Sequence, residues 1–353
     1  MDKPTGAPVA GRDYPSDIAK VRSWFPTDAA CLDYLDWLRW PGGFICPHCA
    51  SAEAGREATG RYRCRKCDKQ VSVTAGTIFH RTRTPLTVWF EATWLMTAPK
   101  MGVSASHVHR VLPVSSYQTA WTMLTKLRQV MSTTDSQPLT GRVEIDETFF
   151  GGPRPGVAGR GAAGKTLVAG AIEIDDHGWG RARLAVINDA SAKSLRAFIT
   201  DNVAPGATVV SDAWRSYPPA LGGYEHVPVN VSASGKPAHE VLPAVHRLFA
   251  QVKRMVEGTY QGSGSVGHLQ EYLDEFVFRF NRRHSRHRGL VFMRLLQRAV
   301  AAAPVGYRDL VRASRVKEKR PPGVVGPRRR PGSLEVVPEK RPWRAAEDRD
   351  SGT

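Results

Sequence analysis

The sequence predicts an α/β protein in which a larger domain, with a mixed sheet flanked by helices, follows two small N-terminal modules. Three observations favour this architecture. Between residues 141 and 256 the apolar pattern changes from strands to a helix, then to a further strand and a further helix. Two closely spaced cysteine pairs and three short helical patterns precede that region. With 353 residues, the chain is long enough for two or three domains with their own cores.

The charge balance favours a polyanionic partner. Lysine and arginine number 50 against 33 aspartates and glutamates, which gives a formal net charge of +17. Each phosphate that a basic side chain neutralises releases counterions, so this surplus indicates nucleic acid binding, with a merely soluble basic protein as the alternative. The sequence lacks a long apolar run and a signal-peptide core, so we expect a cytoplasmic protein, associated with the nucleoid when bound to DNA.

The N-terminal region combines a disordered segment with one helix. Residues 1–22 are polar and contain glycine and proline, so we expect them to be disordered. A helix then begins at Thr27 or Asp28, either of which can cap it, and it ends near Pro41. Cys31 lies in the apolar pattern of this helix and is predicted to be a buried, unreactive thiol.

Four cysteines form the strongest local motif. Cys46 and Cys49 make one Cys-x-x-Cys knuckle, and Cys64 and Cys67 make the second. Two such knuckles place four thiolates around one tetrahedral Zn²⁺, which predicts a zinc ribbon within residues 23–80. Because four thiolates leave no position for water, we expect this zinc to be structural, and disulfides are the weaker alternative in a cytosolic protein.

A small helical domain is expected at residues 81–136. Gly102 begins a turn between a first and a second helix, and Ser116 can cap a third. Three short helices around a glycine-containing turn suit a helix-turn-helix-like DNA-binding domain, with Ser104 and His107 as candidate DNA contacts. Any small helical bundle could show the same pattern.

The larger domain is expected at residues 137–300. The order strand, strand, strand, helix, strand, helix is that of an RNase H-like domain. After it, a basic sequence rich in proline and arginine predicts a disordered tail over residues 301–353. The expected strands are 143–150, 166–174, 181–187 and 207–210, and the expected helices are 191–203, 243–256 and 266–283.

Two carboxylates of this domain are the first catalytic candidates. Asp146 lies in the first expected strand, and Asp212 directly follows the fourth. Acids at strand ends can share one cleft, although an isolated aspartate is more often an ordinary strand-end or cap residue. The following helix carries His246 and Lys253 in one row, where they can face a neighbouring site; a half-buried histidine and a solvated lysine are the alternative.

Two further patterns have competing interpretations. Residues 159–166 match the phosphate-binding loop pattern GxxxxGKT, but that loop needs a helix after it and a strand follows here. We therefore expect a flexible basic loop in which Lys165 contacts DNA. On the last expected helix, Glu275, Arg279 and Arg282 repeat at i, i+4 and i+7, which indicates either a self-satisfied ion-pair row or a row that faces phosphates.

Several separated motifs resemble one known family, the bacterial insertion-sequence transposases of the insertion-sequence-1595 group, with an RNase H-like domain of the DDE type. The resemblance covers roughly residues 25–296. It rests on the cysteine knuckles and on the segments 102–105, 116–121, 143–152, 159–166, 211–217 and, above all, 272–283 (YLDEFVFRFNRR).

The resemblance implies a catalytic site. Asp146 and Asp212 match the first two metal-binding carboxylates, and His246 stands at the third position, seven residues before Lys253. Many relatives have Glu or Asn at that position and some have His, which departs from a strict acidic triad. Histidine can ligate a divalent metal, whereas Mg²⁺ prefers oxygen. Two possible substitutes that lack the family spacing are Glu240 and Glu257.

The implied reaction is two-metal phosphoryl transfer with Mg²⁺ or Mn²⁺. Asp146 would bridge both ions, Asp212 and His246 would each hold one, and Lys253 would contact a DNA phosphate near the cut. The resemblance also implies double-stranded DNA as partner, as transposon ends and target, and a multimer that holds two ends together. Arg279 and Arg282 are further candidate DNA contacts. The alternative is a catalytically inactive DNA-binding protein derived from a transposase.

Overall fold

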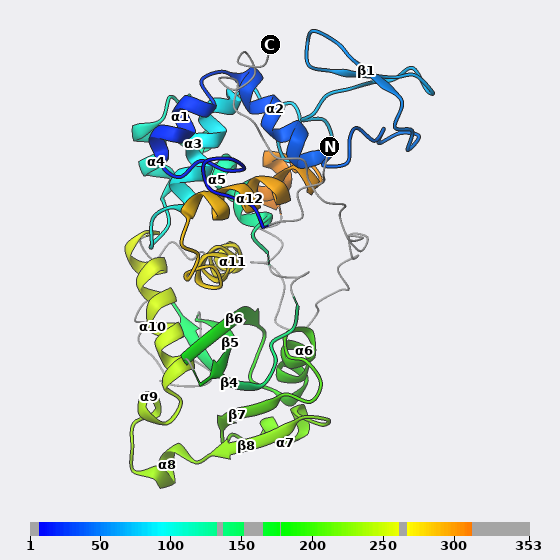
Figure 1. The fold of residues 1–353 in the computed structure, drawn as a ribbon. Helices are drawn as coiled ribbons and strands as arrows, with labels where there is room; N and C mark the ends of the chain where they lie inside the picture. Colours follow the sequence, from blue (N-terminus) through cyan, green and yellow to red (C-terminus); the bar gives the residue numbers. More distant parts are fainter. Residues whose placement is uncertain (1–6, 133–136, 152–164, 177, 261–266, 313–353) are drawn as a thin grey trace. The chain divides into compact units, whose positions relative to one another are not determined.

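The computed structural model (Figure 1) describes residues 7–132, 137–151, 165–176, 178–260 and 267–312. They form two compact units. The first consists of the described residues up to Met131 together with Ser285–Leu310, and the second consists mainly of the described residues of Ser132–His284. Most of the tail expected over residues 301–353 and most of the loop 159–166 lie outside the described residues. Residues 301–312 of that tail are described and are not disordered as expected, because Leu310 is buried and its backbone N–H donates to Gly306 C=O.

The first unit is mainly helical. Helices α1 (Ile18–Trp24), α2 (Asp28–Arg39) and α3 (Leu86–Thr97) pack together with α12 (Arg288–Ala301). The rings of Phe25, Phe90 and Phe292 meet in their core, with centroids 4.7 Å apart for Phe25 and Phe90 and 5.8 Å apart for Phe90 and Phe292.

Two elements of this unit differ from the sequence-based expectations. The segment 1–22 was expected to be disordered, but α1 begins at Ile18, where the side chain of Asp17 accepts a hydrogen bond from the backbone N–H of Lys20. Helix α12 lies within the expected 137–300 domain by sequence, yet it packs on α2 and α3 because its apolar residues are buried among theirs.

Helices α4 (Ala105–Val111) and α5 (Tyr117–Gln129) follow α3 and pack against each other. Ser104 caps α4 by accepting a hydrogen bond from the backbone N–H of His107, and Ser116 caps α5 by accepting one from that of Thr119. The expected helix-turn-helix-like arrangement of three short helices is therefore present, with the cap at Ser116 as predicted.

Between α2 and α3 the chain forms a small antiparallel sheet in the order β1-β2-β3. Its strands are β1 (Ala54–Arg56), β2 (Tyr62–Cys64) and β3 (Gln70–Val71). This sheet is the framework of the expected ribbon.

The second unit contains a five-stranded mixed sheet in the order β6-β5-β4-β7-β8. Strands β4, β5 and β6 are antiparallel neighbours, and β7 and β8 run parallel to β4. This is the RNase H-like topology that the strand order predicted, with one edge strand, β8, that it did not. The bounds are β4 (Arg142–Phe150), β5 (Thr166–Asp175), β6 (Gly178–Ile187), β7 (Thr208–Asp212) and β8 (Glu225–Val229).

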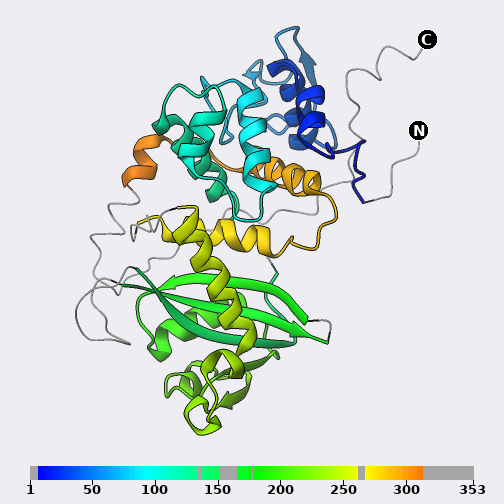
Figure 2. The ribbon, with the colours of Figure 1, turned by 90° about the vertical axis from the view of Figure 1, so that its left-hand side faces the viewer.

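Helices cover both faces of this sheet (Figures 1 and 2). On one face, α6 (Ala192–Asn202) and α7 (Tyr217–Ala220) pack on apolar residues of β4 and β5. On the other face, α10 (Pro243–Gly258) crosses β4 and β5, as Figure 2 shows. The short helices α8 (Val231–Ser234) and α9 (Ala238–Val241) connect β8 to α10. None of the described helices has the length and hydropathy that a bilayer span requires.

Side chains on and directly after helix α11 (Leu269–Phe280) form hydrogen bonds with backbone groups of the edge strand β6. The side-chain amide of Gln270 accepts a hydrogen bond from Val186 N–H and donates one to Leu184 C=O. The amide of Asn281 likewise accepts from Ala182 N–H (2.7 Å) and donates to Ala182 C=O (3.1 Å). Two side-chain amides thus take the place of a neighbouring strand along β6 and close an edge that would otherwise be open to another chain.

Replacement of Asn281 by alanine removes both hydrogen bonds to Ala182. We expect Asn281→Ala to lower the free energy of unfolding by about 1–3 kcal/mol, because it leaves the N–H and C=O of the buried Ala182 unpaired. Urea denaturation measures this change. Asn281→Asp places a carboxylate oxygen against Ala182 C=O where the amide donated, so it should also lower the stability. Equal stability of wild type and Asn281→Ala would contradict the edge-closing role.

Candidate functional site

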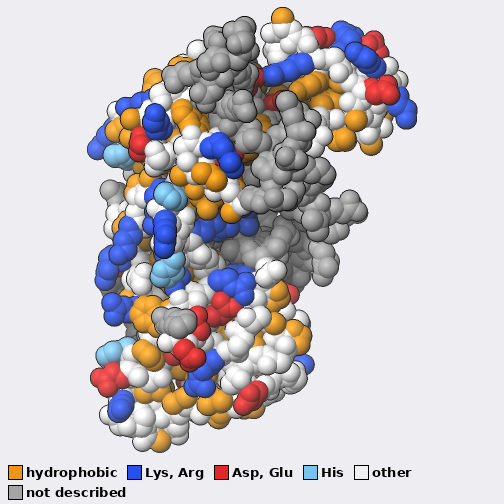
Figure 3. Space-filling model, in the orientation of Figure 1, with side chains coloured by type: hydrophobic (Ala, Val, Ile, Leu, Met, Phe, Trp, Pro, Cys, Tyr) orange, Lys and Arg blue, Asp and Glu red, His pale blue; other side chains and the backbone are white. Residues whose placement is uncertain are grey.

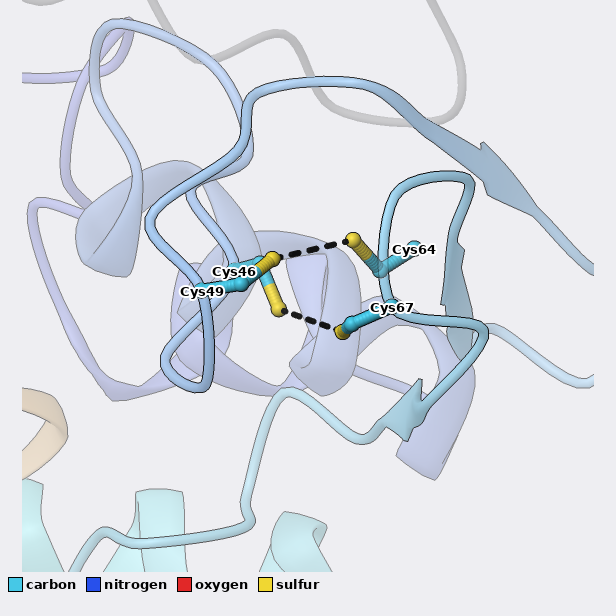
Figure 4. Close-up of side chains that lie close together, drawn as sticks. All are labelled: Cys46, Cys49, Cys64 and Cys67. Atoms are coloured by element: carbon cyan, nitrogen blue, oxygen red, sulfur yellow. Dashed lines mark hydrogen bonds between the residues drawn. The ribbon is translucent and has the colours of Figure 1, made fainter.

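Four cysteine sulfurs converge in the ribbon (Figure 4), and all of them lie within 4.8 Å of one another. The sulfur of Cys46 is 3.7 Å from that of Cys67, and the sulfur of Cys49 is 3.5 Å from that of Cys64. Two thiolates about 2.3 Å from one tetrahedral Zn²⁺ lie about 3.8 Å apart, whereas disulfide sulfurs lie about 2.05 Å apart. The four sulfurs therefore fit the predicted structural zinc and exclude the disulfide alternative.

The surroundings of the four sulfurs favour metal binding. Backbone N–H groups of Cys67 and Lys66 lower the pKa of Cys64 to about 7 and stabilise its thiolate. The backbone N–H of Ser51 lowers the pKa of Cys49, but burial and the neighbouring thiols outweigh it and raise that pKa to about 12. The ring of Tyr62 stacks on Phe44 at 4.5 Å, and its hydroxyl donates a hydrogen bond to Asp36 of α2. The ribbon is thereby joined to the helix that precedes it.

A second cluster of functional side chains forms where β4 meets α10. Nε2 of His246 lies 3.2 Å from Oδ2 of Asp146. About two turns further along α10, Nζ of Lys253 donates a hydrogen bond to Oγ1 of Thr148 at 2.7 Å. Because side chains two residues apart on a strand share a face, Asp146 and Thr148 both point to α10. The structure thus brings together three of the predicted residues.

The contact between His246 and Asp146 has the spacing of two metal ligands. Nε2 of His246 is buried and makes no aligned hydrogen bond in spite of its approach to Asp146. Two ligand atoms about 2.1 Å from one octahedral ion lie about 3 Å apart when they are neighbours. The other oxygen of Asp146, Oδ1, accepts a hydrogen bond from the backbone N–H of Glu147 and is fixed in direction. The pair fits one divalent ion.

Asp212 lies on the strand next to Asp146. Strands β4 and β7 are parallel and pair up to Glu144 and Val210, so Asp146 and Asp212 lie two residues further on at the same level. Oδ1 of Asp212 accepts a hydrogen bond from the backbone N–H of Trp214. Among the described residues, only the four cysteines bring three or more ligand atoms within 4.8 Å of one another, so Asp212 completes no such group with Asp146 and His246 here.

A glycine permits the close approach of α10 to this site. Gly170 of β5 pairs with Asp146 in the sheet. A Cβ on Gly170 would lie 2.5 Å from Cε1 of Phe249, so any larger residue would push α10 away from the strands. The ring of Phe249 in turn contacts that of His246, with centroids 6.4 Å apart.

The two predicted lysines lie near each other at the end of β4. Burial lowers the pKa of Lys253; Lys165 lowers it further, while Glu257 opposes the change. Lys165 directly precedes Thr166, which pairs with Phe150 at the end of β4, and Nζ of Lys253 lies 5.7 Å from the ring centroid of Phe150. Two positive charges therefore flank the same strand end.

Sequence reasoning missed a tyrosine on the opposite face of the sheet. The hydroxyl of Tyr217 is buried and donates a 2.6 Å hydrogen bond to Oε1 of Glu147. Burial, followed by Glu147, Asp146 and Asp212, raises the pKa of Tyr217, so it stays a neutral donor. The contact ties the turn after Asp212 to the strand of Asp146. The sequence motif 211–217, which ends at this tyrosine, was the feature that could have identified it.

Glu275 and Arg279 of α11 pair with each other, as in the first of the two predicted alternatives, and do not face outward toward phosphates. Glu275 is fully buried, accepts hydrogen bonds from the hydroxyl of Tyr260 and lies 3.3 Å from Arg279. Arg279 is 6% exposed and also donates to the sulfur of Met255, so its predicted contact with DNA is absent from this arrangement. Arg282 is half-buried, with its guanidinium 3.9 Å from the ring centroid of Phe278.

The two candidates on the helical domain have different surroundings. Ser104 is engaged as the cap of α4, whereas His107 is exposed on the first turn of that helix. His107 is therefore available to a partner in a way that the Ser104 hydroxyl is not.

Loss of one knuckle cysteine should release the zinc. We expect Cys46→Ala to reduce bound zinc from about one ion per chain to near zero, because three thiolates hold the metal poorly and the ribbon folds around it. Metal analysis of the purified protein measures the zinc content. Cys31→Ala, a buried cysteine of α2, serves as the matched control and should keep its zinc. Full zinc content in Cys46→Ala would contradict the ligand set.

Two regions of the chain match known protein families. The ISXO2-like transposase domain family matches residues 138–281, and the transposase zinc-ribbon domain family matches residues 26–70. An uncharacterized protein in transposable element ISH50 of Halobacterium salinarum is 24% identical over 212 residues, which is 55% of this chain and 70% of the relative.

Two solved structures of Mos1 transposase are distant neighbours. The pre-cleavage Mos1 transpososome has a TM-score of 0.26 at 13% identity, over 62% of this chain and 75% of that one. The Mos1 paired-end complex with the left transposon end has a TM-score of 0.25 at 13% identity, over 59% and 65%. With TM-scores this low, neither comparison carries a conclusion. The two family matches, however, follow the predicted order and together span more than half of the chain. Residues 138–281 belong to the ISXO2-like transposase domain family, and residues 26–70 belong to the transposase zinc-ribbon domain family.

Proposed function

We propose that this DNA transposase cleaves DNA strands at the ends of an insertion sequence and joins them to a target by metal-dependent phosphoryl transfer. The observation that carries this proposal is the buried contact of Asp146 with His246, with Asp212 on the adjacent parallel strand of a family-matched domain. Two acids and an imidazole at one end of two neighbouring strands form a donor set for divalent ions.

The three residues of this set would hold the divalent ions, Asp146 and Asp212 through carboxylate oxygens and His246 through a ring nitrogen. Bound Mg²⁺ or Mn²⁺ supplies activation of a water or a 3′-hydroxyl and stabilisation of the leaving oxygen. The chain itself orients Asp146 through Glu147 N–H and buries Nε2 of His246.

Basic residues beside the site bind the DNA backbone. Lys253 and Lys165 lie at the end of β4, where they contact the phosphates next to the scissile bond. Figure 3 shows Lys and Arg side chains gathered over the outer side of α10, where Arg247 and Arg254 are exposed. Arg282 adds a half-exposed charge in the turn after α11. Arg279 supports α11 from within, since its partner is Glu275.

The first unit binds the ends of the element. Residues 92–134 contain no aspartate or glutamate, and α4 exposes His107, His109 and Arg110. A surface without acids is complementary to a polyanion, and a helix-turn-helix-like pair offers two short helices to a groove. Because strand transfer joins two ends, we propose that the protein acts as a multimer on double-stranded DNA.

Removal of the Asp146 carboxylate should separate cleavage from binding. We expect Asp146→Ala to lower the rate of strand cleavage by about a hundredfold or more, the order of loss when one electrostatic stabiliser of a transition state is removed. Gel analysis of a duplex carrying the element's ends measures cleavage, and fluorescence anisotropy measures binding, which should stay within twofold of wild type, about 0.4 kcal/mol. Asp201→Ala, an exposed acid of α6, is the control. Cleavage at the wild-type rate would contradict the assignment.

The identity of the third ligand should set the choice of metal. Mg²⁺ prefers oxygen ligands and tolerates imidazole poorly, so we expect the wild type to cleave faster with Mn²⁺ than with Mg²⁺. His246→Glu should raise the ratio of the Mg²⁺ rate to the Mn²⁺ rate. The same ratio in both proteins would speak against His246 as a ligand. Binding without cleavage under either metal would instead identify a DNA-binding protein derived from a transposase.

A further inference from the structure

One buried carboxylate of the second unit has no part in the proposed reaction. Glu144 stands two residues before Asp146 on β4, faces α10 with it and is only 5% exposed. Its Oε2 accepts hydrogen bonds from the backbone N–H groups of Ala244 at 2.9 Å and of Val245 at 3.0 Å. A carboxylate buried this deeply is costly unless such donors satisfy it.

These donors belong to the first turn of α10. The helix begins with Pro243, which has no N–H, and the preceding Leu242 provides no side-chain cap. Ala244 and Val245 therefore hold the free N–H groups that an N-cap side chain usually satisfies. Glu144 performs this capping from a strand one hundred residues away in sequence, and its negative charge lies at the positive end of the helix.

The cap determines where His246 lies. His246 directly follows Val245, whose N–H is fixed to Glu144, and its target Asp146 is on the same strand as Glu144. Asp146 lies on β4 itself, and His246 is held to β4 through Glu144. The same short segment of β4 therefore fixes both residues of the 3.2 Å contact between Nε2 and Oδ2. We propose that Glu144 is a positioning residue of the metal site, which holds His246 against Asp146 by capping α10; this rests on the proposed function, in which both residues bind the metal.

The remainder of α10 has other attachments. Leu248, Phe249 and Val252 are buried against the sheet, and Lys253 is bonded to Thr148. Loss of the cap should therefore loosen the first turn, which carries His246, while the following turns keep their packing. This separates a positioning effect from loss of the fold.

A double-mutant cycle tests the proposal in the zinc-loaded full chain. Mn²⁺ is titrated into wild type, Glu144→Ala, His246→Ala and the double variant, with binding followed by the Mn²⁺ paramagnetic resonance signal. We expect Glu144→Ala to weaken Mn²⁺ affinity about 10- to 100-fold, the usual effect of a residue that orients a metal ligand. In the His246→Ala background the same change should have almost no effect, because the residue that the cap positions is gone.

The conservative variant separates capping from charge and packing. The side-chain oxygen of Glu144→Gln can accept the same two hydrogen bonds, so this variant should retain most of the Mn²⁺ affinity. Thermal unfolding of every variant sets a temperature at which all are folded during the titration.

The outcomes distinguish this inference from the proposed function. Additive losses in the double variant, or wild-type Mn²⁺ affinity in Glu144→Ala, would overturn the positioning role while leaving His246 as a ligand. Wild-type Mn²⁺ affinity in His246→Ala would remove His246 from the metal site and overturn both. A loss in Glu144→Ala that vanishes without His246 would support the inference.

Discussion

Contact of one face of β4 with α10 is the constraint on which the second unit depends. Side chains alternate along a strand, so Glu144, Asp146 and Thr148 share the face toward α10 while Val143 and Ile145 enter the opposite core. Each of the three polar residues meets a different level of the helix. Gly170, beside Asp146, leaves room for Phe249 and lets the two elements approach. A shift of α10 by one turn would break all of these contacts together.

The cysteine cluster of the ribbon and the proposed site on β4 differ in the type of ligand atom that they offer. The ribbon offers four sulfurs at closed tetrahedral spacing, which leaves no position for a reactant. The β4 site offers oxygen and one nitrogen, and its second acid, Asp212, lies on a neighbouring strand without closing the group. In the proposed reaction, oxygens of the DNA substrate would also bind the metal.

Local patterns predicted the parts of the fold that depend on local physics. Knuckle spacing predicted the ribbon, and strand patterns predicted β4 and β7, which carry Asp146 and Asp212. Strand β8 was not predicted, because it is short and contains Pro228, as edge strands often do. The cap of α10 by Glu144 and the burial of Arg279 depend on partners distant in sequence, which no periodicity reveals. For Arg279 the i, i+4 spacing gave both alternatives, and the surrounding residues decided between them.

The central claim is that His246 binds the catalytic metal beside Asp146. Electron spin echo modulation of Mn²⁺ bound to the zinc-loaded protein tests it most directly, because an imidazole nitrogen bonded to Mn²⁺ modulates the echo. We expect nitrogen modulation in the wild type and its loss in His246→Glu with Mn²⁺ still bound. Bound Mn²⁺ without nitrogen modulation in the wild type, or with the same modulation in His246→Glu, would contradict the claim.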